Sequence, residues 1–453
     1  MAKLNESAPR RPGGSAGPVA EEPSAQALDA HDHRKLGSRL GLFALDPAVG
    51  KGLPLWLPNG TVIRDELEKL ARELEFKAGF QRVATPHLAR TELYRRSGHL
   101  PYFAPDMYPL LEVVEEKNED DSASSAELRD EYALRPMNCP HHHRVFAARP
   151  RSYRDLPLRL AEYGQVYRWE KSGALSGLAR VRGMCMNDGH IYCTAEQVEP
   201  EIHAVLDMYA AVYALLGIDG CRFRLSRRDP NDGRDKYVDD DAAWVWSEAL
   251  LRGVLEKRGV TFDDGVGHAA FYGPKIDIQV RTLGGTEETL STVQLDFAQP
   301  ARLGLSFTAP SGKPAVPYCI HRAPLSTHER FVAFLVELYG GAFPTWLAPV
   351  QLLVVPVSDA QRGYADAIVQ RLRAKLVRAE AAPSGDTVAR SVREAAEQKI
   401  PNVVVVGKRE AASGGVSLRR HGVEQQSSLS VDELERALLR SIERRDRSLG
   451  LAE

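Results

Sequence analysis

The chain has 453 residues, of which 43% are hydrophobic and 26% charged, with a formal net charge of −2. This composition is typical of a soluble globular protein with two or three domains. There is no apolar run of the roughly 18 residues that a membrane span needs, no apolar signal core at the N-terminus, and the five cysteines are too few for a disulfide scaffold. We therefore expect a cytoplasmic protein, with no membrane partner, whose cysteines are free to bind metal.

The first elements are a tail, a helix and a strand. Residues 1–30 are rich in Pro, Gly, Ala, Ser and Glu without periodicity, which predicts a disordered tail. Thr61–Lys77 is predicted to be a helix that ends near Gly79, and Phe80–Ala84 a strand that ends at Pro86. The apolar residues on one face of the helix are Ile63, Leu67, Leu70 and Leu74.

An acidic stretch and a long hairpin follow. Residues 112–131 are acidic and rich in Ser and Ala, so we expect a solvated surface insertion there. The strand-like segments Leu158–Glu170 and Arg180–Cys193 flank a loop rich in Gly and Ser. This pattern predicts a long antiparallel hairpin.

Alternation along the hairpin predicts which side chains share a face. It places Arg168 and Glu170 together on the first strand, and Met186, Asp188 and His190 together on the second. An arginine in such a place can hold a phosphate through two hydrogen bonds. An isolated Arg–x–Glu pair, by contrast, is usually a surface ion pair.

The rest of the chain separates into two patterns. Strands near Ile276–Arg281 and Thr292–Phe297, with a buried helix at Phe331–Tyr339, predict an antiparallel sheet flanked by helices. After Trp346, strands and helices alternate, which predicts a small α/β domain with a mainly parallel sheet. Its predicted elements are a strand at Val350–Val357, a helix with the stripe Tyr364, Ile368, Leu372 and Leu376, a strand at Val403–Val406, and a helix that starts at Ser430 with Glu433 in capping-box spacing. The predicted domains are residues 31–347 and 348–447.

Several long strings resemble one family. The string from Glu162 to Cys193 resembles motif 2 of threonyl-type class II aminoacyl-tRNA synthetases, and Phe80–Pro86 and His321–Arg330 occupy the places of motifs 1 and 3. The other matching strings are Arg135-Pro-Met-Asn-Cys-Pro140, Phe271-Tyr-Gly-Pro-Lys275, Val293-Gln-Leu-Asp-Phe297 and Phe343-Pro-Thr-Trp-Leu-Ala-Pro349. The resemblance covers about residues 32–445. It implies an α+β class II catalytic domain with an antiparallel sheet flanked by helices, an α/β anticodon-binding domain and a homodimer.

The resemblance also implies a reaction. The carboxylate of threonine attacks the α-phosphate of ATP to form threonyl-adenylate and pyrophosphate, and the acyl group then moves to tRNA. Arg168 matches the arginine on the α-phosphate, Glu170 a residue that places adenine, and Arg330 the arginine at the γ-phosphate. Arg180 and Gln294 are likewise assigned to ATP binding. Mg2+ is expected to accompany ATP.

Three scattered residues match the zinc ligands of the family, namely Cys139, His190 and His321. Their spacing alone would not identify a site. Three nitrogen and sulfur ligands leave an open position, as in catalytic zinc sites, and the resemblance implies that the amino group and hydroxyl of threonine fill it. Valine lacks the hydroxyl and would be rejected.

The same resemblance assigns substrate-contacting residues around the zinc position. Asp188 and Tyr272 match residues near the polar groups of the amino acid, and Lys275 and Thr327 are assigned to substrate binding as well. The run His141–His143 beside Cys139 is interpreted as a polar loop in preference to a second metal site.

Departures from the family pattern gather in the pocket. Met186 and Asn187 stand where a glutamine and a carboxylate are typical, and Thr289 and Leu290 replace Gln and Cys. Motif 3 reads Leu325-Ser-Thr-His-Glu-Arg330 in place of Leu-Gly-Ser-Met-Glu-Arg, which adds bulk to the pocket. The ATP-binding and zinc-binding positions are unchanged, which favours a specialised enzyme over a decayed one.

The predicted second domain also departs from the pattern, because Ser384–Thr387 replaces an Arg-Asn-Glu-Lys stretch and loses two basic side chains. The editing and ubiquitin-like domains of many bacterial members are not expected before Asp32. Three functions stay open. They are a threonyl-tRNA synthetase, a paralogue that activates threonine or another β-hydroxy amino acid for a different acceptor or serves as an inhibitor-resistant copy, and a non-catalytic tRNA-binding regulator.

Overall fold

The structure is a computed structural model, and it describes residues 30–114, 129–232, 236–282 and 285–451. Residues 1–29, predicted as a tail, and residues 115–128 of the acidic insertion lie outside the described residues. The ends of that insertion belong to two antiparallel strands, β5 (Leu111–Val114) and β6 (Arg129–Leu134). None of the helices in the described part of the chain combines the length and apolar character that a transmembrane segment needs.

The first domain is built on a sheet of eight strands. Their bounds are β3 Gln81–Arg82, β7 Leu158–Tyr167, β8 Gly183–Cys193, β9 Arg222–Arg227, β10 Phe262–Val266, β11 Lys275–Arg281, β12 Glu287–Asp296 and β15 Tyr318–Ala323. The spatial order is β10-β9-β11-β12-β15-β8-β7-β3, and only the two outermost pairs are parallel. The predicted antiparallel sheet is therefore confirmed.

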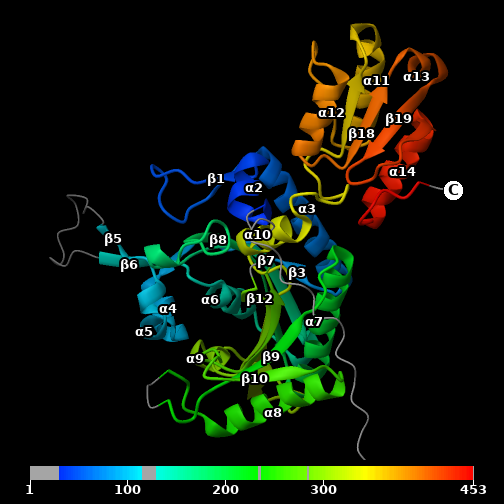
Figure 1. The fold of residues 1–453 in the computed structure, drawn as a ribbon. Helices are drawn as coiled ribbons and strands as arrows, with labels where there is room; N and C mark the ends of the chain where they lie inside the picture. The colour runs from blue at the N-terminus through cyan, green and yellow to red at the C-terminus, as the bar shows by residue number, and fades with distance from the viewer. Residues whose placement is uncertain (1–29, 115–128, 233–235, 283–284, 452–453) are drawn as a thin grey trace, which may run out of the picture.

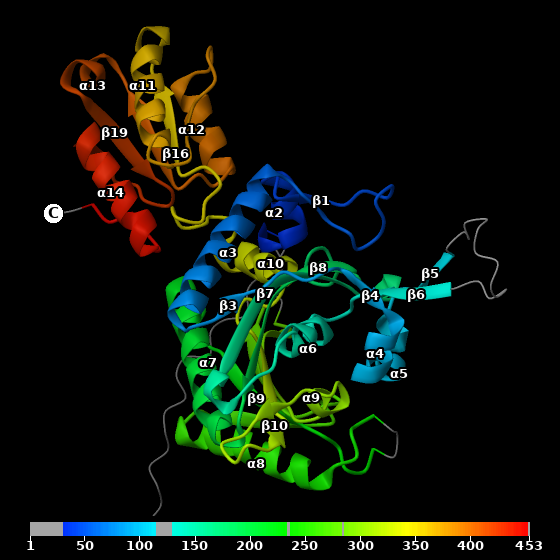
Figure 2. The ribbon, with the colours of Figure 1, turned by 180° about the vertical axis from the view of Figure 1, so that it is seen from behind.

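Four long helices cover this sheet, as Figures 1 and 2 show from opposite sides. They are α3 (Pro58–Lys77), α7 (Ala195–Leu216), α8 (Asp241–Lys257) and α10 (His328–Tyr339). The predicted stripe of α3 is confirmed, because Ile63, Leu67 and Leu70 are buried and Leu74 packs against the same core. Gly79 follows the helix with a φ of +77°, a conformation that costs glycine little.

The strand predicted at Phe80–Ala84 is shorter in the structure. Only Gln81 and Arg82 pair with β7. The Thr85 amide donates to the Glu162 carboxylate at 3.0 Å and so leaves the strand ladder. The two paired residues form the exposed edge of the sheet.

The predicted hairpin is confirmed as β7 and β8, which pair from Leu158–Tyr192 to Tyr167–Gly183. It ends earlier than expected, however. The Trp169 amide donates to the Asp106 carbonyl at 2.8 Å, so the chain leaves the sheet after Tyr167. Strand alternation therefore does not place Arg168 and Glu170 on a common face.

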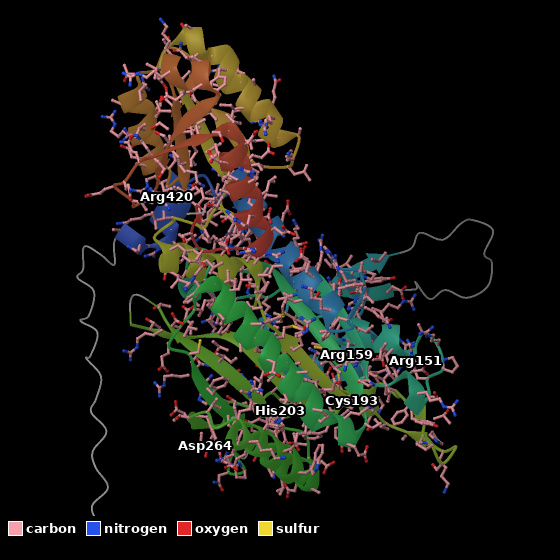
Figure 3. All side chains as sticks on the ribbon, turned by 90° about the vertical axis from the view of Figure 1, so that its right-hand side faces the viewer. Arg151, Arg159, Cys193, His203, Asp264 and Arg420 are labelled. Atoms are coloured by element: carbon pink, nitrogen blue, oxygen red, sulfur yellow. The ribbon has the colours of Figure 1, made fainter. Side chains whose placement is uncertain are left out.

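A partly buried ion pair joins helix α7 to the sheet. Arg159 on β7 donates from Nε to the Glu201 carboxylate on α7 at 2.7 Å, near Cys193 at the end of β8 (Figure 3). The apolar residues of α7 on the same face, among them Val198, Ile202 and Val205, are fully buried. This packing makes the β7–β8 hairpin a rigid floor for the site.

The second domain has a five-stranded sheet in the order β17-β16-β18-β19-β20. Its elements are β16 Leu352–Pro356, α11 Arg362–Arg373, β17 Ala379–Ala381, α12 Val388–Glu397, β18 Asn402–Val406, α13 Lys408–Ser413, β19 Gly415–Arg420, β20 Ser427–Ser430 and α14 Val431–Arg444. The capping box predicted at Ser430 and Glu433 is confirmed. The apolar stripe predicted for α11 is too long by one residue. Leu376 lies beyond the end of the helix and is 88% exposed.

The prediction of a mainly parallel sheet in this domain was wrong. β16 pairs in parallel with β17 and β18, but β18–β19 and β19–β20 are antiparallel. The reason is the short connection from β18 to β19 through α13, which returns the chain antiparallel instead of making a full crossover. Ion pairs from Arg378 to Glu66 and from Arg445 to Glu73 join the domain to α3.

Candidate functional site

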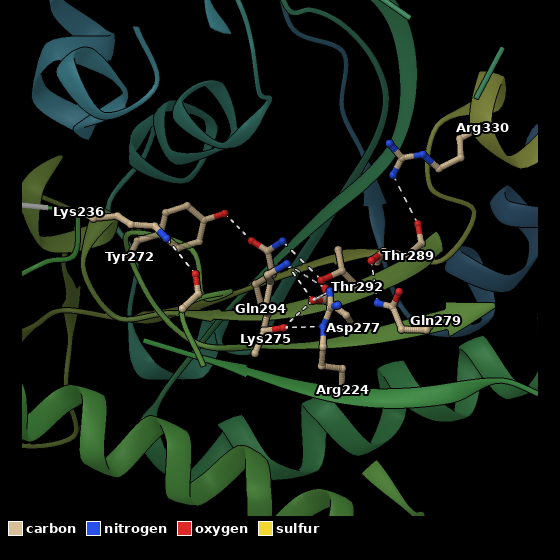
Figure 4. Close-up of polar contacts among 12 residues, drawn as sticks. Arg224, Lys236, Tyr272, Lys275, Asp277, Gln279, Thr289, Thr292, Gln294 and Arg330 are labelled. Carbon is tan, nitrogen blue, oxygen red and sulfur yellow. Dashed lines mark hydrogen bonds and ion pairs between the residues drawn. The ribbon is translucent and has the colours of Figure 1, made fainter. Parts of the chain in front are cut away.

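A pocket opens on one face of the large sheet, between β8, β11, β12 and β15 and the start of α10 (Figure 4). It brings together nine of the residues predicted for the site. They are Cys139, Arg168, Asp188, Tyr272, Lys275, Gln294, His321, Thr327 and Arg330. Residues far apart in the chain meet here because the central strands are neighbours in the sheet.

Two guanidinium groups face this pocket without a carboxylate partner among the residues that the structure describes. Within the described part of the chain, the guanidinium of Arg168 donates only to the Pro136 carbonyl, at 3.2 Å, and that of Arg330 only to the Ala179 and Thr289 carbonyls, at 3.5 and 3.4 Å. Burial lowers the pKa of Arg168, and the nearby charge of Arg330 lowers it further. Two neighbouring, partly desolvated cations of this kind favour an anionic ligand.

A polar network lies along the floor of the pocket (Figure 4). The Tyr272 hydroxyl donates to the Gln294 amide oxygen. The Lys275 ammonium is paired with the buried Asp277 carboxylate at 2.9 Å, and Arg224 donates to the same carboxylate at 3.1 Å. Lys275 and Arg224 therefore share one carboxylate, which leaves this part of the pocket with a net positive charge.

Three residues predicted for the site have structural contacts that the other predicted residues lack. Glu170 and Arg180 lie outside the pocket lining and form an ion pair with each other, at 2.8 Å between Nη2 and Oε2. The Thr327 hydroxyl lines the pocket but also caps α10, where it accepts from the Arg330 amide at 3.2 Å. Thr327 also bridges to Met186 on β8, so this departure from the family pattern connects motif 3 with the hairpin.

The three predicted zinc ligands converge beside the pocket. One ligand atom from each of Cys139, His190 and His321 lies within 4.8 Å of the others. His190 and His321 are directly opposite each other on β8 and β15, with ring centroids 4.4 Å apart. Cys139 is the first residue of helix α6 (Cys139–Ala147), and all three residues are buried.

A relay of hydrogen bonds sets the tautomer of His190. The Glu162 carboxylate accepts from His142 Nε2 at 3.0 Å, so the other nitrogen of His142 is an acceptor. That nitrogen faces His190 Nδ1 at 2.8 Å, which leaves His190 Nε2 with a free lone pair. His190 Nε2 is indeed buried without a hydrogen-bond partner among the described residues. An orphaned imidazole nitrogen of this kind fits a metal ligand.

The surroundings of His321 and Cys139 also determine where these two ligands carry their protons. His321 Nε2 donates a hydrogen bond to the Asp296 carboxylate at 2.9 Å, which leaves Nδ1 as the nitrogen with a lone pair. Burial raises the pKa of the Cys139 thiol well above its usual range, so the thiol keeps its proton until a cation replaces it. The Asp188 carboxylate accepts from the Asn138 amide at 3.0 Å, next to this cluster.

The interpretation of His141–His143 as a polar loop was wrong. All three residues are buried on α6, because Cys139 and Pro140 start a helix whose inner face packs on the sheet. Burial lowers the pKa of His141 to about 4. His143 accepts from or donates to the Tyr192 hydroxyl at 3.0 Å, beside His190.

Comparisons with known proteins identify the family. The family described as "tRNA synthetase class II core domain (G, H, P, S and T)" matches residues 122–339, and "Anticodon binding domain" matches residues 351–441. A crystal structure titled as the RNA binding domain of threonyl-tRNA synthetase from Cryptosporidium parvum is 32% identical with a TM-score of 0.82, and the match covers 93% of this chain and 99% of that one. The chain belongs to the threonyl-tRNA synthetase family.

Curated relatives of this family are closer in sequence. A threonine–tRNA ligase from Halalkalibacterium halodurans is 46% identical over 90% of this chain and 61% of its own length. One from Thermus thermophilus is 47% identical over 86% of this chain and 57% of its own length. This member of the threonyl-tRNA synthetase family thus spans about three fifths of the curated relatives that it matches.

Sequence reasoning missed the residues that support the cluster. Glu162, His142 and Asp296 hold the histidines, and none of them was predicted for the site. The sequence does indicate His142 in one respect. It follows Cys139 at the i+3 spacing that places two side chains on one face of a helix. Glu162 and Asp296 lie in motif strings of the threonyl-tRNA synthetase family but carry no local mark of their role.

Proposed function

We propose that this chain activates threonine with ATP to form threonyl-adenylate and transfers the threonyl group to tRNA. The observation that carries the proposal is one pocket in which Arg168 and Arg330, neither with a carboxylate partner among the described residues, lie near the buried ligand cluster of Cys139, His190 and His321. The arginines suit a polyphosphate, and the cluster suits a small polar amino acid. A reaction between the two ligands requires that one pocket hold both.

The arginines act mainly by position and charge. Arg168 holds the α-phosphate where the carboxylate of threonine attacks it in line, and Arg330 holds the pyrophosphate that leaves. Both side chains are partly desolvated, which strengthens their interaction with developing negative charge. Mg2+ accompanies ATP and neutralises the remaining phosphate charge.

The residues beside the cluster position the amino acid. A zinc ion held by Cys139, His190 and His321 would supply a Lewis acid for the amino group and hydroxyl of threonine. The Asp188 carboxylate accepts hydrogen bonds from the same groups, and Asn138 fixes its orientation. The Tyr272 ring stacks on His321, with centroids 4.9 Å apart, and closes the pocket on that side.

A second candidate function is activation of threonine, or of another β-hydroxy amino acid, for an acceptor other than threonine-specific tRNA. The loop Ser384–Thr387 favours it, because its only charged side chain, Asp386, is paired with Arg390 at 3.1 Å. Such a loop offers little positive charge to an RNA backbone. Charging of threonine-specific tRNA by the purified chain separates the two functions, since only the first predicts threonyl-tRNA as product.

Selectivity among similar amino acids is a direct consequence of the proposed pocket. Valine lacks the hydroxyl and should show no exchange of pyrophosphate into ATP above background. Serine keeps both polar groups and lacks one methyl, so discrimination against it should be only about 10–200-fold, or roughly 1–3 kcal/mol. Steady-state kcat/KM for the three amino acids measures this. If serine were rejected as strongly as valine, the proposed polar recognition would be wrong.

A homodimer is also expected. The sheet edge β3 is exposed, and Phe76 at the end of the adjacent α3, a large apolar side chain a few residues before that edge, is 82% exposed. A two-fold contact would cover both features. Light scattering at micromolar concentration should give twice the mass of the chain, and Phe76→Glu should shift it toward one chain. A single-chain mass for the unmodified protein would contradict this prediction.

A further inference from the structure

A second cluster of metal-ligating side chains lies behind the pocket. It consists of Glu68 on α3, Cys185 on β8 and His328, the first residue of α10. One ligand atom from each lies within 4.8 Å of the others. The cluster shares no residue with the Cys139–His190–His321 cluster.

The two clusters lie on opposite faces of the sheet. Met184 and Met186 line the pocket, so Cys185 between them points to the other face of β8. Cys185 and His328 are buried, whereas the Glu68 side chain is 16% exposed. A cation can therefore reach the cluster from the Glu68 side without passing through the pocket.

The side chains are already held for coordination. His328 Nε2 lies 3.0 Å from Glu68 Oε1, and the His328 ring stacks on Tyr163 with centroids 4.6 Å apart. Burial raises the pKa of the Cys185 thiol to about 12, although Arg64 beside it acts in the opposite direction, so the thiol keeps its proton until a cation displaces it. Little side-chain entropy is then left to lose when a metal binds.

The donor set suits zinc in both chemistry and charge. Thiolate sulfur, imidazole nitrogen and carboxylate oxygen are the three ligand types that Zn2+ takes in proteins. The thiolate of Cys185 and the carboxylate of Glu68, which also pairs with Arg72, supply negative charge for the ion, and neutral His328 adds none. The partial exposure at Glu68 leaves room for a water as the fourth ligand.

We propose that Glu68, Cys185 and His328 form a second, structural zinc site that joins α3, β8 and α10. As the Zn–S bond forms, the Cys185 proton passes to water. The ion takes the place of the proton between His328 Nε2 and Glu68, and His328 stays neutral by carrying its proton on Nδ1. The site fixes the first turn of α10, which carries Arg330 two residues after His328. It does not touch the reacting groups, so its role is positioning.

Metal analysis of the full-length purified chain tests the site. With one zinc in each cluster, the unmodified protein should hold two, and Cys185→Ser and His328→Met should each lose one. In Cys139→Ala, Co2+ added in place of zinc should still give a thiolate-to-cobalt charge-transfer band, which Cys139→Ala/Cys185→Ser should lack. Because the readout is the metal bound through Cys185, it does not depend on whether the first cluster or the proposed reaction is correct.

Two further variants distinguish a specific loss of zinc from a loss caused by misfolding. Glu68→Gln changes a partly exposed residue and should lower zinc affinity while leaving the circular dichroism spectrum unchanged. Cys193→Ser, a buried cysteine at the far end of the same strand, should keep the full zinc content. The site is refuted if Cys185→Ser and Glu68→Gln both retain all the zinc, or if the cobalt form of Cys139→Ala has no thiolate band.

Discussion

Replacing Arg168 with alanine should lower threonine-dependent ATP–pyrophosphate exchange by about 10²–10³-fold, because it removes a preorganised charge from the reacting phosphate. Arg330→Ala should have a similar effect. Neither residue is paired with a carboxylate among the described residues, so the fold loses only weak hydrogen bonds to carbonyls. The melting temperature of both variants should therefore stay close to that of the unmodified chain.

Arg154→Ala is a matched control, since this arginine is exposed and lies on the surface beside Tyr153. It should leave exchange unchanged. Arg168→Lys keeps the charge but loses the two-pronged geometry, and should fall between the unmodified chain and Arg168→Ala. Normal exchange by Arg168→Ala would contradict the assignment of this residue to the phosphate.

Replacing Cys139 with alanine should remove one zinc per chain and raise the threonine concentration for half-maximal exchange by at least about 100-fold, equivalent to roughly 2.8 kcal/mol. The physical reason is that two histidines alone make an incomplete site for zinc. Inductively coupled plasma mass spectrometry measures the metal, and exchange kinetics measure the threonine dependence.

Cys221→Ala provides the control for this variant, because Cys221 is half-buried at the edge of the core and belongs to none of the three groups of metal-ligating side chains found among the described residues. It should change neither the zinc content nor the threonine dependence. Full retention of zinc by Cys139→Ala would show that the cluster of Cys139, His190 and His321 is not a zinc site.

Local pattern was sufficient for much of the fold. The 3.6-residue stripe of α3 and the capping box at Ser430 predicted two helices that the structure contains, and two strand-like segments on either side of a loop rich in Gly and Ser predicted the β7–β8 hairpin. These features depend on residues close together in the chain. The length of strands was harder to predict, because the ends of β3 and β7 are set by bonds to Glu162 and Asp106, which are distant in sequence.

The site, too, depends on contacts between residues that are distant in sequence. The convergence of Cys139, His190 and His321 follows from neighbouring strands in the sheet, and no spacing in the sequence encodes it. It was predicted only through the family resemblance. The buried histidines of α6 show the opposite case, where polar residues suggested a loop but tertiary packing buried them. The Glu68–Cys185–His328 cluster likewise needed three elements to be placed together before it could be recognised.

The most direct test of the proposed function is threonine-dependent exchange of labelled pyrophosphate into ATP, measured with the purified chain against the full set of amino acids. The proposed function predicts exchange with threonine, weaker exchange with serine and none above background with valine. This order requires both the arginines of the pocket and the polar recognition beside Cys139. No exchange with any amino acid, from folded protein that contains zinc, would contradict the proposal that this chain is an amino-acid-activating enzyme.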